Sequence, residues 1–536
     1  MGAENMKANT RVSLTAMVGL LMISACSSSV PTATNTTFAG PQLFSVKPTP
    51  ERSVLQNTAD GYLATLLADP AHKEIILVDA NPALVTDTTQ ELAVTLPGGK
   101  TASFHLRDFK RINADYHGWV GYRASDWKQQ HPSSEEIDFD PGYYLSIVRH
   151  GSQLVGELQV EGQRYQLANI GGDKHVLIEV DESKLPSEDL DVTDQAKALP
   201  LPSAHQQPQS SGSTIRLLFV TTNQARIKYP NYPADLMLGL QNLNQTTKNS
   251  QIDITYELAG IMNVNYDETG KSFGYMLNSV QYFMPDVARV RDQVHAHLVS
   301  MLVASNELCG AGKPGLTKRY GFSAISCISS LAHEIGHNFG LNHHWNGTSV
   351  GYNNGYRHEP ASGIRFRTQM AYECSPACPR VSFYSTPRLS YQGQPLGTVA
   401  HHDAARAINE RRHIIESYYP PTLKAIRVTV YDNLNMQGSH CSFEIPATQR
   451  VTMIGEECGA PWQFRVWSAK VENITPGTVL RLGNSNAWHT YTSQFYGGDF
   501  DVPSLFYTGH EVPDGLILKP HSNTLTKLID RVEIIK

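Results

Sequence analysis

HEIGHNFGLNH, residues 333–343, places three histidines and one glutamate in the pattern H-E-x-x-H-x-x-G-x-x-H. On a helix, His333 and His337 are four residues apart and face the same side, so both imidazoles can bind one metal ion. Glu334 lies beside them and can accept a proton from a metal-bound water. The first half of the stretch therefore predicts a metal site with its own general base.

The second half of the stretch predicts a third ligand. Gly340 can adopt the left-handed conformation that ends a helix and turns the chain, which would bring His343 back to the metal. Three histidines leave one tetrahedral position open for water, which is typical of catalytic zinc. We therefore expect one catalytic Zn²⁺. The alternative is an amphipathic helix that happens to carry histidines.

About thirty residues further on, TQMAY at residues 368–372 resembles the Met-turn of the metzincin metallopeptidases. In that clan the turn passes beneath the metal, which would be the position of Met370 here. A methionine that merely fills the core is the alternative. Tyr372 follows two residues later, where astacins and serralysins place a tyrosine that can reach the zinc or steady the oxyanion. A packed or surface tyrosine is the alternative for Tyr372.

The resemblance covers residues 215–419, which are similar to the reprolysin-like branch and most similar to bacterial peptidyl-Asp metalloendopeptidases. It implies an α/β metzincin catalytic domain over residues 214–421 and a zinc-dependent endopeptidase with protein or glycoprotein substrates. The chain departs from the pattern at His344, where reprolysins carry Asp. The matching segments are NSQI (249–252), Cys309-Gly310, ECSPACPR (373–380), STP (385–387) and GQPLG (393–397).

Two other functional classes deserve comparison. An anchored adhesin could use an inactive peptidase scaffold, but loss of activity usually removes the glutamate or a ligand, and all four residues are present. A zinc amidase or deacetylase is disfavoured by the Met-turn. Arg365, Arg367 and Arg380 near the cleft could favour acidic substrates, although the sequence does not fix where their side chains point.

The start of the chain indicates export. Residues 12–25 are apolar, follow Lys7 and Arg11, and are too few to span a bilayer as a helix. They end in ISAC (23–26), which resembles a bacterial lipobox and implies cleavage after residue 25 with a lipid on Cys26. An ordinary secretory signal is the alternative. Because Ser27 rather than Asp follows, we expect an outer-membrane lipoprotein of the bacterial envelope.

The remaining six cysteines fall into three pairs that are local in sequence, as expected in an oxidising compartment. The local pairing is Cys309 with Cys327, Cys374 with Cys378, and Cys441 with Cys458. A structural zinc on Cys374 and Cys378 is the alternative, but no neighbouring pair completes four ligands.

Composition indicates a globular chain of several domains, with 40% hydrophobic and 18% charged residues. The net charge of −6 and the lack of a basic run argue against nucleic acid as a partner. Protein substrates and a membrane contact through the lipid remain the expected partners.

Residues 26–193 are predicted to be mainly β and resemble, by position, the propeptide of reprolysin-like enzymes. No cysteine follows Cys26 in this segment, which excludes a cysteine switch. Asp173 could ligate the metal instead, although a turn residue is the favoured interpretation. Residues 194–213 are predicted to be a linker, and a cut there would activate the enzyme and release it from its anchor. A permanent anchor with an N-terminal spacer is the alternative.

Hydrophobic patterns predict the elements of the two remaining regions. In the α/β region the strand at 320–326 is expected to be the edge strand that pairs with substrate. Residues 422–536 are predicted to be a β-sandwich-like domain, possible relatives being the βγ-crystallins, and their aromatic residues could bind carbohydrate or simply form a core. The predicted strands of the α/β region are 215–222, 252–259, 299–304 and 320–326, and the predicted helices are 234–248, 284–297 and 404–418. The aromatic residues are Trp488, Tyr491, Phe495, Tyr496, Phe506 and Tyr507.

Overall fold

The computed structural model describes residues 40–112, 115–188, 212–345, 347, 351–419, 425–445, 451–462, 465–483, 491–502, 516–518 and 531–535. The predicted signal segment 1–25, Cys26 and the predicted linker as far as residue 211 lie outside this range. Among the residues that the structure describes, no helix has the length and apolar character needed to cross a bilayer.

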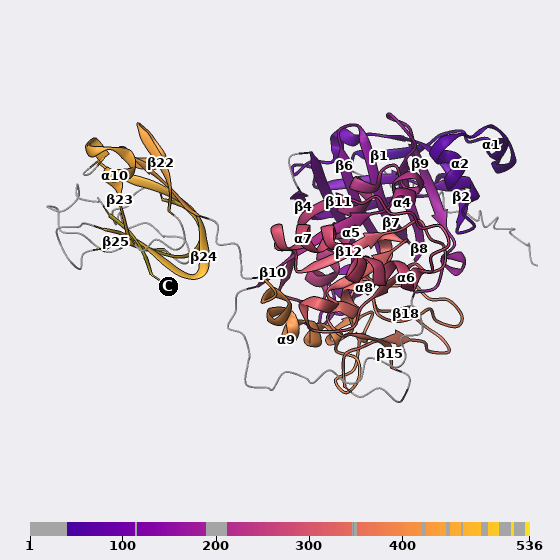
Figure 1. Cartoon of the computed structure of the whole chain (residues 1–536). Helices are drawn as coiled ribbons and strands as arrows, with labels where there is room; N and C mark the ends of the chain where they lie inside the picture. Colours follow the sequence, from indigo (N-terminus) through magenta and orange to yellow (C-terminus); the bar gives the residue numbers. More distant parts are fainter. Residues whose placement is uncertain are drawn as a thin grey trace, which may run out of the picture. The chain divides into compact units, whose positions relative to one another are not determined.

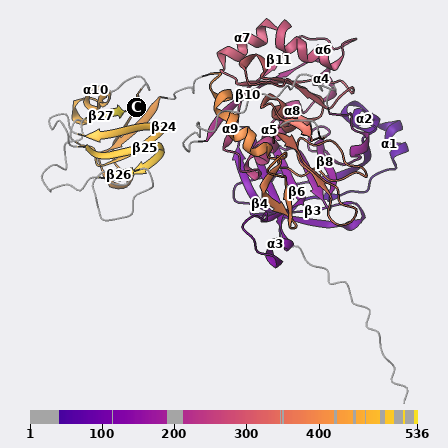
Figure 2. The same cartoon turned by 90° about the horizontal axis from the view of Figure 1, so that it is seen from below.

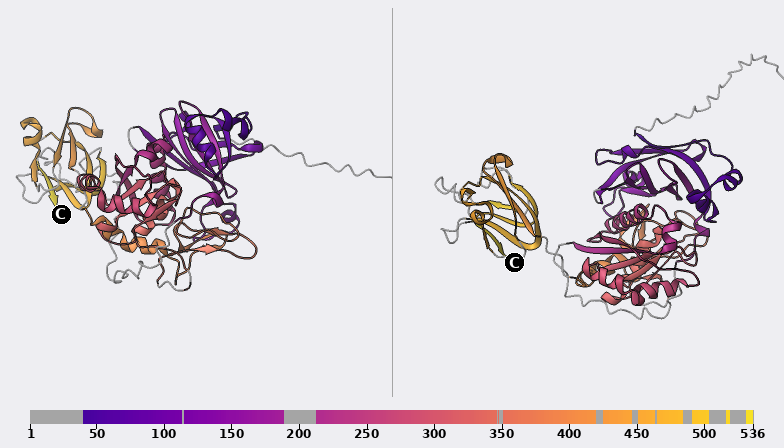
Figure 3. Two further views of the ribbon diagram at one scale, coloured as in Figure 1. Left: turned by 45° about the vertical axis from the view of Figure 1, so that its right-hand side comes forward. Right: turned by 45° about the horizontal axis from the view of Figure 1, so that its top comes forward.

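The N-terminal part is a closed β-barrel, which confirms the prediction of a mainly β region (Figures 1 and 3). Its strands follow the order β1-β2-β9-β8-β7-β6-β5-β4-β3, antiparallel except where β1 and β3 close the barrel in parallel. Trp119 and Phe104 are fully buried in its interior. The strands are β1 (Gln42–Val46), β2 (His72–Ala80), β3 (Glu91–Thr95), β4 (Thr101–Arg111), β5 (Tyr116–Ala124), β6 (Phe139–His150), β7 (Gln153–Val160), β8 (Gln163–Asn169) and β9 (His175–Val180).

Two helices between β1 and β2 were not predicted. Leu55, Leu66 and Leu67 are their buried residues, and they form a cluster with Ile75 and Ile178 outside the main barrel core. Both helices are short, so their apolar periodicity is too brief to stand out from the sequence. The helices are α1 (Arg52–Thr58) and α2 (Gly61–Ala68), and a third, α3 (Asp126–Gln130), follows β5.

A five-stranded sheet follows, in the order β11-β10-β12-β14-β13. Its first four strands are parallel, and β13 joins one edge antiparallel to β14. Helices cover both faces (Figure 2), so residues 217–220 of β10 form a continuous apolar run, although the first half of the strand alternates. The strands are β10 (Ser213–Thr221), β11 (Ile254–Asn263), β12 (Leu298–Leu302), β13 (Gly310–Gly312) and β14 (Phe322–Ile325).

The two faces have separate cores. Leu217 and Phe219 of β10 pack with α5, α8 and α9, whereas Leu218 and Val220 pack with α6 and α7. The predicted helices 234–248, 284–297 and 404–418 correspond to α5, α7 and α9, and α4 and α6 were not predicted. The helices are α4 (Asn223–Lys228), α5 (Tyr232–Asn249), α6 (Phe273–Asn278), α7 (Pro285–Gln293), α8 (Leu331–Asn338) and α9 (Ala404–Glu416).

The prediction that residues 320–326 form the edge strand of the sheet was wrong. The segment 320–326 forms β14, which has neighbours on both sides, and the edge is β13. Strand β13 has the sequence Gly-Ala-Gly, which is too short and too glycine-rich to show a strand pattern. The Cys309–Cys327 disulfide fastens this edge to the strand beside it.

Three short strand pairs follow α8 along the chain: β15 (Asn342–His344) with β16 (Asn354–Gly355), β17 (Arg357–His358) with β18 (Phe366–Arg367), and β19 (Thr386–Tyr391) with β20 (Gln394–Leu396). The three predicted disulfides, 309–327, 374–378 and 441–458, are all present. The structure therefore uses Cys374 and Cys378 as a disulfide rather than as zinc ligands.

The C-terminal part is β-rich, as predicted. Its strands form one sheet in which β24 pairs with β21, β25 and β27. The finer predictions of a β-sandwich, a βγ-crystallin likeness and a carbohydrate-binding face stay predictions. Of the aromatic residues named for that face, the described residues include only the backbone of Tyr491, Phe495 and Tyr496. The elements are β21 (Ile426–Tyr431), β22 (His440–Ile445), β23 (Val451–Met453), α10 (Ile454–Cys458), β24 (Ser468–Gly483), β25 (Tyr491–Val502), β26 (Leu516–Leu518) and β27 (Arg531–Ile535).

Candidate metal centre

Helix α8 carries the first two histidines and the glutamate of the motif, and all of its residues are buried. Leu331, Ile335 and Phe339 recur at helical spacing and are almost completely buried on the side that packs against the sheet and α5. The Tyr384 hydroxyl donates to the carbonyl of Ala332, 2.6 Å away, which fixes the first turn. These contacts therefore fix the position of α8, the helix that carries His333, His337 and Glu334.

The predicted turn after the helix is present. Gly340 has φ +72°, the left-handed region that favours glycine. Arg411 of α9 donates from Nη1 to the carbonyls of Phe339 and Gly340 at 2.7 and 3.0 Å, and Asn353 donates to Gly340 at 2.7 Å. These bonds satisfy carbonyls that the end of a helix leaves without partners in the helix. The turn then delivers His343 in β15.

The three histidines come together as predicted. Their ligand atoms lie within 4.8 Å of one another, so His333, His337 and His343 could hold a metal ion. Nδ1 of His333 lies 2.9 Å from the carbonyl of Gln369, and Nδ1 of His337 lies 2.9 Å from the carbonyl of Leu341. In the tautomer that donates to these carbonyls, Nε2 keeps the lone pair that binds a metal. The donor set fits zinc, which three imidazoles bind in catalytic sites.

Glu334 lies against the edge strand. It is fully buried, and a Cβ added to Gly310 of β13 would collide with its carboxylate. The glycine therefore permits Glu334, the predicted general base, to lie directly beside the strand that is expected to bind substrate.

The segment predicted as the Met-turn lies beneath the helix. Met370 is fully buried, and a Cβ added to Gly336 would collide with its Sδ atom. Tyr372 stacks on the imidazole of His343, with ring centroids 4.1 Å apart, and meets His344 edge-on at 5.5 Å. The structure thus brings Tyr372 to the third histidine, and His344 to the same tyrosine.

The structure fixes the directions of the three arginines. Arg365 donates to the carbonyls of Pro360 and Pro376, away from the histidines. Arg367 is buried and pairs with Glu373 at 2.6 Å. Arg380 forms a two-pronged ion pair with Glu188, a residue from the end of the barrel region. Burial and the neighbouring guanidinium of Arg380 lower the pKa of Arg367 to about 10.

Glu188 is the site residue that sequence reasoning missed. Its carboxylate accepts a hydrogen bond from Ser330 Oγ at 2.9 Å and lies 3.6 Å from Nδ1 of His333. Burial acts most strongly, to raise the pKa of Glu188, but attraction to Arg380 and to its other positive neighbours together outweighs burial and holds the pKa well below its usual range. No motif marks this glutamate, because its partners are far away in the chain. Asp173, which the sequence suggested as a possible metal ligand from the N-terminal region, lies in an exposed turn between β8 and β9. This agrees with the favoured interpretation, that Asp173 is a turn residue.

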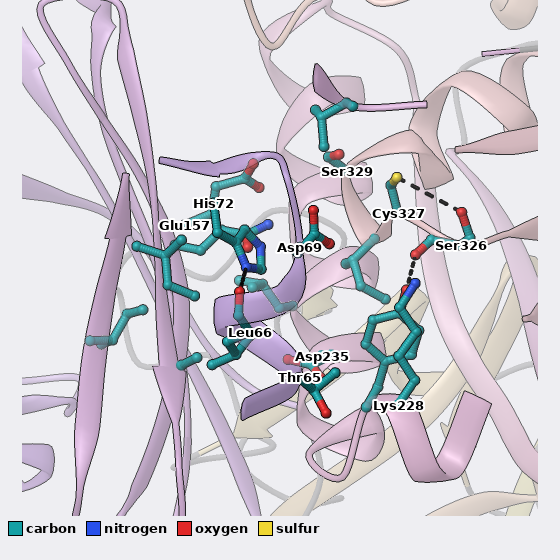
Figure 4. Close-up of a pocket in the computed structure, with 18 of the residues that line it drawn as sticks. Thr65, Leu66, Asp69, His72, Glu157, Lys228, Asp235, Ser326, Cys327 and Ser329 are labelled. Atoms are coloured by element: carbon teal, nitrogen blue, oxygen red, sulfur yellow. Dashed lines mark hydrogen bonds between the residues drawn. The ribbon is translucent and has the colours of Figure 1, made fainter. Parts of the chain in front are cut away.

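A pocket that is separate from the three histidines lies between α2 of the barrel region and the start of α5 (Figure 4). Asp69, His72, Lys228 and Asp235 line it. Burial raises the pKa of Asp235 to about 7 and lowers the pKa of Lys228. The pocket therefore holds a carboxyl group whose pKa lies close to neutral pH, at the contact between the two regions.

Comparison with known proteins gives consistent matches across the metal centre. Two family models described as metallo-peptidase family M12B, reprolysin-like, match residues 236–344 and 318–399. A peptidyl-Asp metalloendopeptidase of Stenotrophomonas maltophilia (strain R551-3) is 31% identical over 319 residues, which cover 56% of this chain and 76% of the relative. A protein of the same name from Xanthomonas campestris pv. campestris is 28% identical over 393 residues, covering 69% and 92%. Both family models span the three histidines.

Likeness to solved structures is weaker. Metalloproteinase-II from Bacteroides fragilis superposes with a TM-score of 0.31 at 13% identity, covering 47% of this chain and 81% of that protein.

The raised pKa of Asp235 predicts a pH dependence. The folded state binds the proton of Asp235 more tightly than the unfolded state, in which the pKa is about 4. Ionisation of this carboxyl therefore lowers the free energy of unfolding of the protein as pH rises from about 4 through 7. We expect Asp235→Asn to gain roughly a few kcal/mol over the parent protein across that window. Melting curves of both proteins at pH 5 to 8 measure this, and a difference that stays constant with pH contradicts it.

The contacts of Arg411 predict its role in the turn. Arg411→Met leaves two helix-end carbonyls with fewer donors, so we expect about 2–4 kcal/mol of destabilisation and weaker retention of zinc. Arg406→Met is the matched control, because Arg406 lies on the same helix but pairs with Glu410 near the surface. Melting temperature and zinc content after dialysis are the readouts. Equal values for the two variants would show that the turn does not depend on Arg411.

Proposed function

The chain belongs to the reprolysin-like metallopeptidases and is a zinc metalloendopeptidase, and from this premise we propose that His333, His337 and His343 hold its zinc and that Glu334 is its general base. The convergence of the three imidazoles within 4.8 Å is the observation that carries this proposal. The buried position of Glu334 on the same helix supports it.

In this mechanism the residues have separate tasks. Zinc, when bound, polarises the scissile carbonyl and makes water a better nucleophile at neutral pH. Glu334 takes the proton of the attacking water and passes it to the departing amine nitrogen. The backbone of β13 pairs with the extended substrate beside Glu334. Stacked on His343, Tyr372 keeps that imidazole oriented, and it is also our candidate for steadying the oxyanion.

The substrate class comes from the relatives. Both are named peptidyl-Asp metalloendopeptidases. We propose that this chain likewise cleaves proteins at peptide bonds beside acidic residues. Arg380 supports this preference, because its buried guanidinium can bind a carboxylate. The carboxylate that it binds in this structure, that of Glu188, lies 3.6 Å from Nδ1 of His333.

We propose that the barrel region is a removable propeptide. Polar side chains of α5 face the barrel, where Gln241 donates to Ser146 Oγ at 2.7 Å and Gln245 to Asp108 Oδ2 at 2.9 Å. Asn249 donates to the Tyr122 hydroxyl at 2.9 Å. The contact is mixed rather than purely polar, since Val148 and Val155 of the barrel share a core cluster with α5, and Phe139 shares one with Phe383. Separation would therefore expose apolar surface as well as these polar groups.

Together with the lipobox, this leads to a proposed location. A lipid on Cys26 would anchor the uncut chain to the outer membrane, with the barrel between the anchor and the peptidase. Cleavage in the linker would then release the peptidase from the membrane.

The mechanism is tested by separating metal binding from proton transfer. Glu334→Ala should lose casein hydrolysis by roughly a hundredfold or more yet retain zinc, because the base is removed and the ligands stay. His337→Ala should lose both zinc and activity. Glu410→Ala, a surface change on α9, serves as the control. Full caseinolytic activity in Glu334→Ala, assayed before and after limited proteolysis, would overturn the mechanism.

Release is tested by fractionating cells that produce the protein. We expect the active soluble species to begin within residues 189–213 and the membrane fraction to hold the chain that begins at Cys26. If all activity stays with membranes as the uncut chain, the barrel is a permanent spacer instead.

A further inference from the structure

We propose that Arg380 is the residue that selects an acidic side chain at the cleavage site, and that Glu188 occupies this position as a built-in, substrate-like inhibitor. This inference rests on the proposed function and deepens it: it names the specificity-determining residue and the group that blocks it before activation.

The side-chain contacts have the geometry of carboxylate recognition. Nη1 of Arg380 donates to Oε1 of Glu188 at 2.7 Å, and Nη2 donates to Oε2 in parallel. Ser330, just before α8, adds a third hydrogen bond to Oε1 at 2.9 Å. Two parallel bonds from one guanidinium match the two oxygens of a carboxylate and no neutral side chain.

The backbone of the same segment lies on the substrate-binding edge. The carbonyl of Ser187 accepts a hydrogen bond from the amide of Cys309 at 2.9 Å, and Glu188 forms a parallel bridge with Gly310. Gly310 is the residue against which the carboxylate of Glu334 packs. Residues 187 and 188 therefore lie as a bound peptide would: their backbone is on β13 and the acidic side chain is beside the first zinc ligand.

The charges around Arg380 show why removal of the barrel region would create a binding site for a carboxylate. Arg367 has Glu373 as a partner within its own loop. Among the residues that the structure describes, Glu188 is the one carboxylate within 4.0 Å of Arg380. Once Glu188 leaves, a largely buried guanidinium loses its counter-charge, which is unfavourable until another carboxylate replaces it. The acidic side chain of a substrate is that replacement.

There is room next to Arg380 for such a side chain. A pocket is lined by Arg380, Gln369 and Ala332 on the peptidase side and by Tyr144 and Arg164 on the barrel side. The barrel thus supplies one wall of the pocket, and Glu188 pairs with the Arg380 that lines the other wall. Separation of the two regions would remove both this wall and the partner of Arg380.

The first experiment measures selectivity in the processed enzyme. Two peptides that differ only by Asp or Asn at the selected position are compared. Arg380→Gln should reduce the Asp-over-Asn ratio of kcat/KM by about a hundredfold, mainly through the Asp peptide, since the loss of a paired charge is larger than that of a neutral contact. Arg365→Gln, a neighbouring arginine that points elsewhere, should leave the ratio unchanged.

The outcomes separate this inference from the proposed function. An Arg380→Gln enzyme that cleaves the Asn peptide like the parent but keeps the parent's Asp-over-Asn ratio overturns the inference and leaves the peptidase intact. A parent enzyme that holds zinc and cleaves neither peptide nor casein overturns both.

The second experiment tests the inhibitor. A synthetic peptide of residues 184–190 should inhibit the processed enzyme competitively, and its Glu188→Gln form should bind about tenfold more weakly. Against Arg380→Gln enzyme the two peptides should bind alike. The full-length chain with Glu188→Gln should also hydrolyse peptides faster than the parent chain, whereas Glu182→Gln, which changes a nearby acid that faces Arg367, should not. Equal inhibition of the parent enzyme by both peptides would refute the assignment of Glu188.

Discussion

The buried guanidinium of Arg411 holds the turn on which the geometry of the metal centre depends. It is fully buried on α9 and donates to the last carbonyls of the metal-binding helix, where the helix dipole also favours a positive charge. Two of the proposed ligands precede this turn and the third follows it. An interaction between segments about seventy residues apart therefore supports the turn that joins them.

Local geometry explains what could be predicted from the sequence. The spacing of His333 and His337 is a property of any helix, and Gly340 is a local signal for its end, so the ligand set could be read without knowing the fold. The disulfides were predictable because each closes a short loop. The edge of the sheet was not, since β13 has almost no side chains and is defined only by its pairing with β14.

Glu188 shows the other limit of prediction. Its hydrogen-bond partner Arg380 is 192 residues away, and neither residue carries a pattern that points to the other. The features of a site that a sequence shows directly, such as spacing and motif, belong to single segments of chain. A pair that forms only when the segment after the barrel packs against the loop that carries Arg380 belongs to the packing of two regions, so the direction of the Arg380 side chain became visible only in the structure.

The position of Glu188 has a consequence for how latency would end. Among the described residues, the segment that contacts β13 ends with Glu188, ahead of the predicted linker 194–213, so a cut in that linker removes the tether but leaves every described contact of Glu188 and of α5 in place. Such a cut converts an intramolecular inhibitor, at an effective concentration of about millimolar, into a separate molecule that must stay bound at its bulk concentration. Dilution would then be the trigger: the nicked enzyme would remain silent where it is crowded and become active as it diffuses away from the cell that made it.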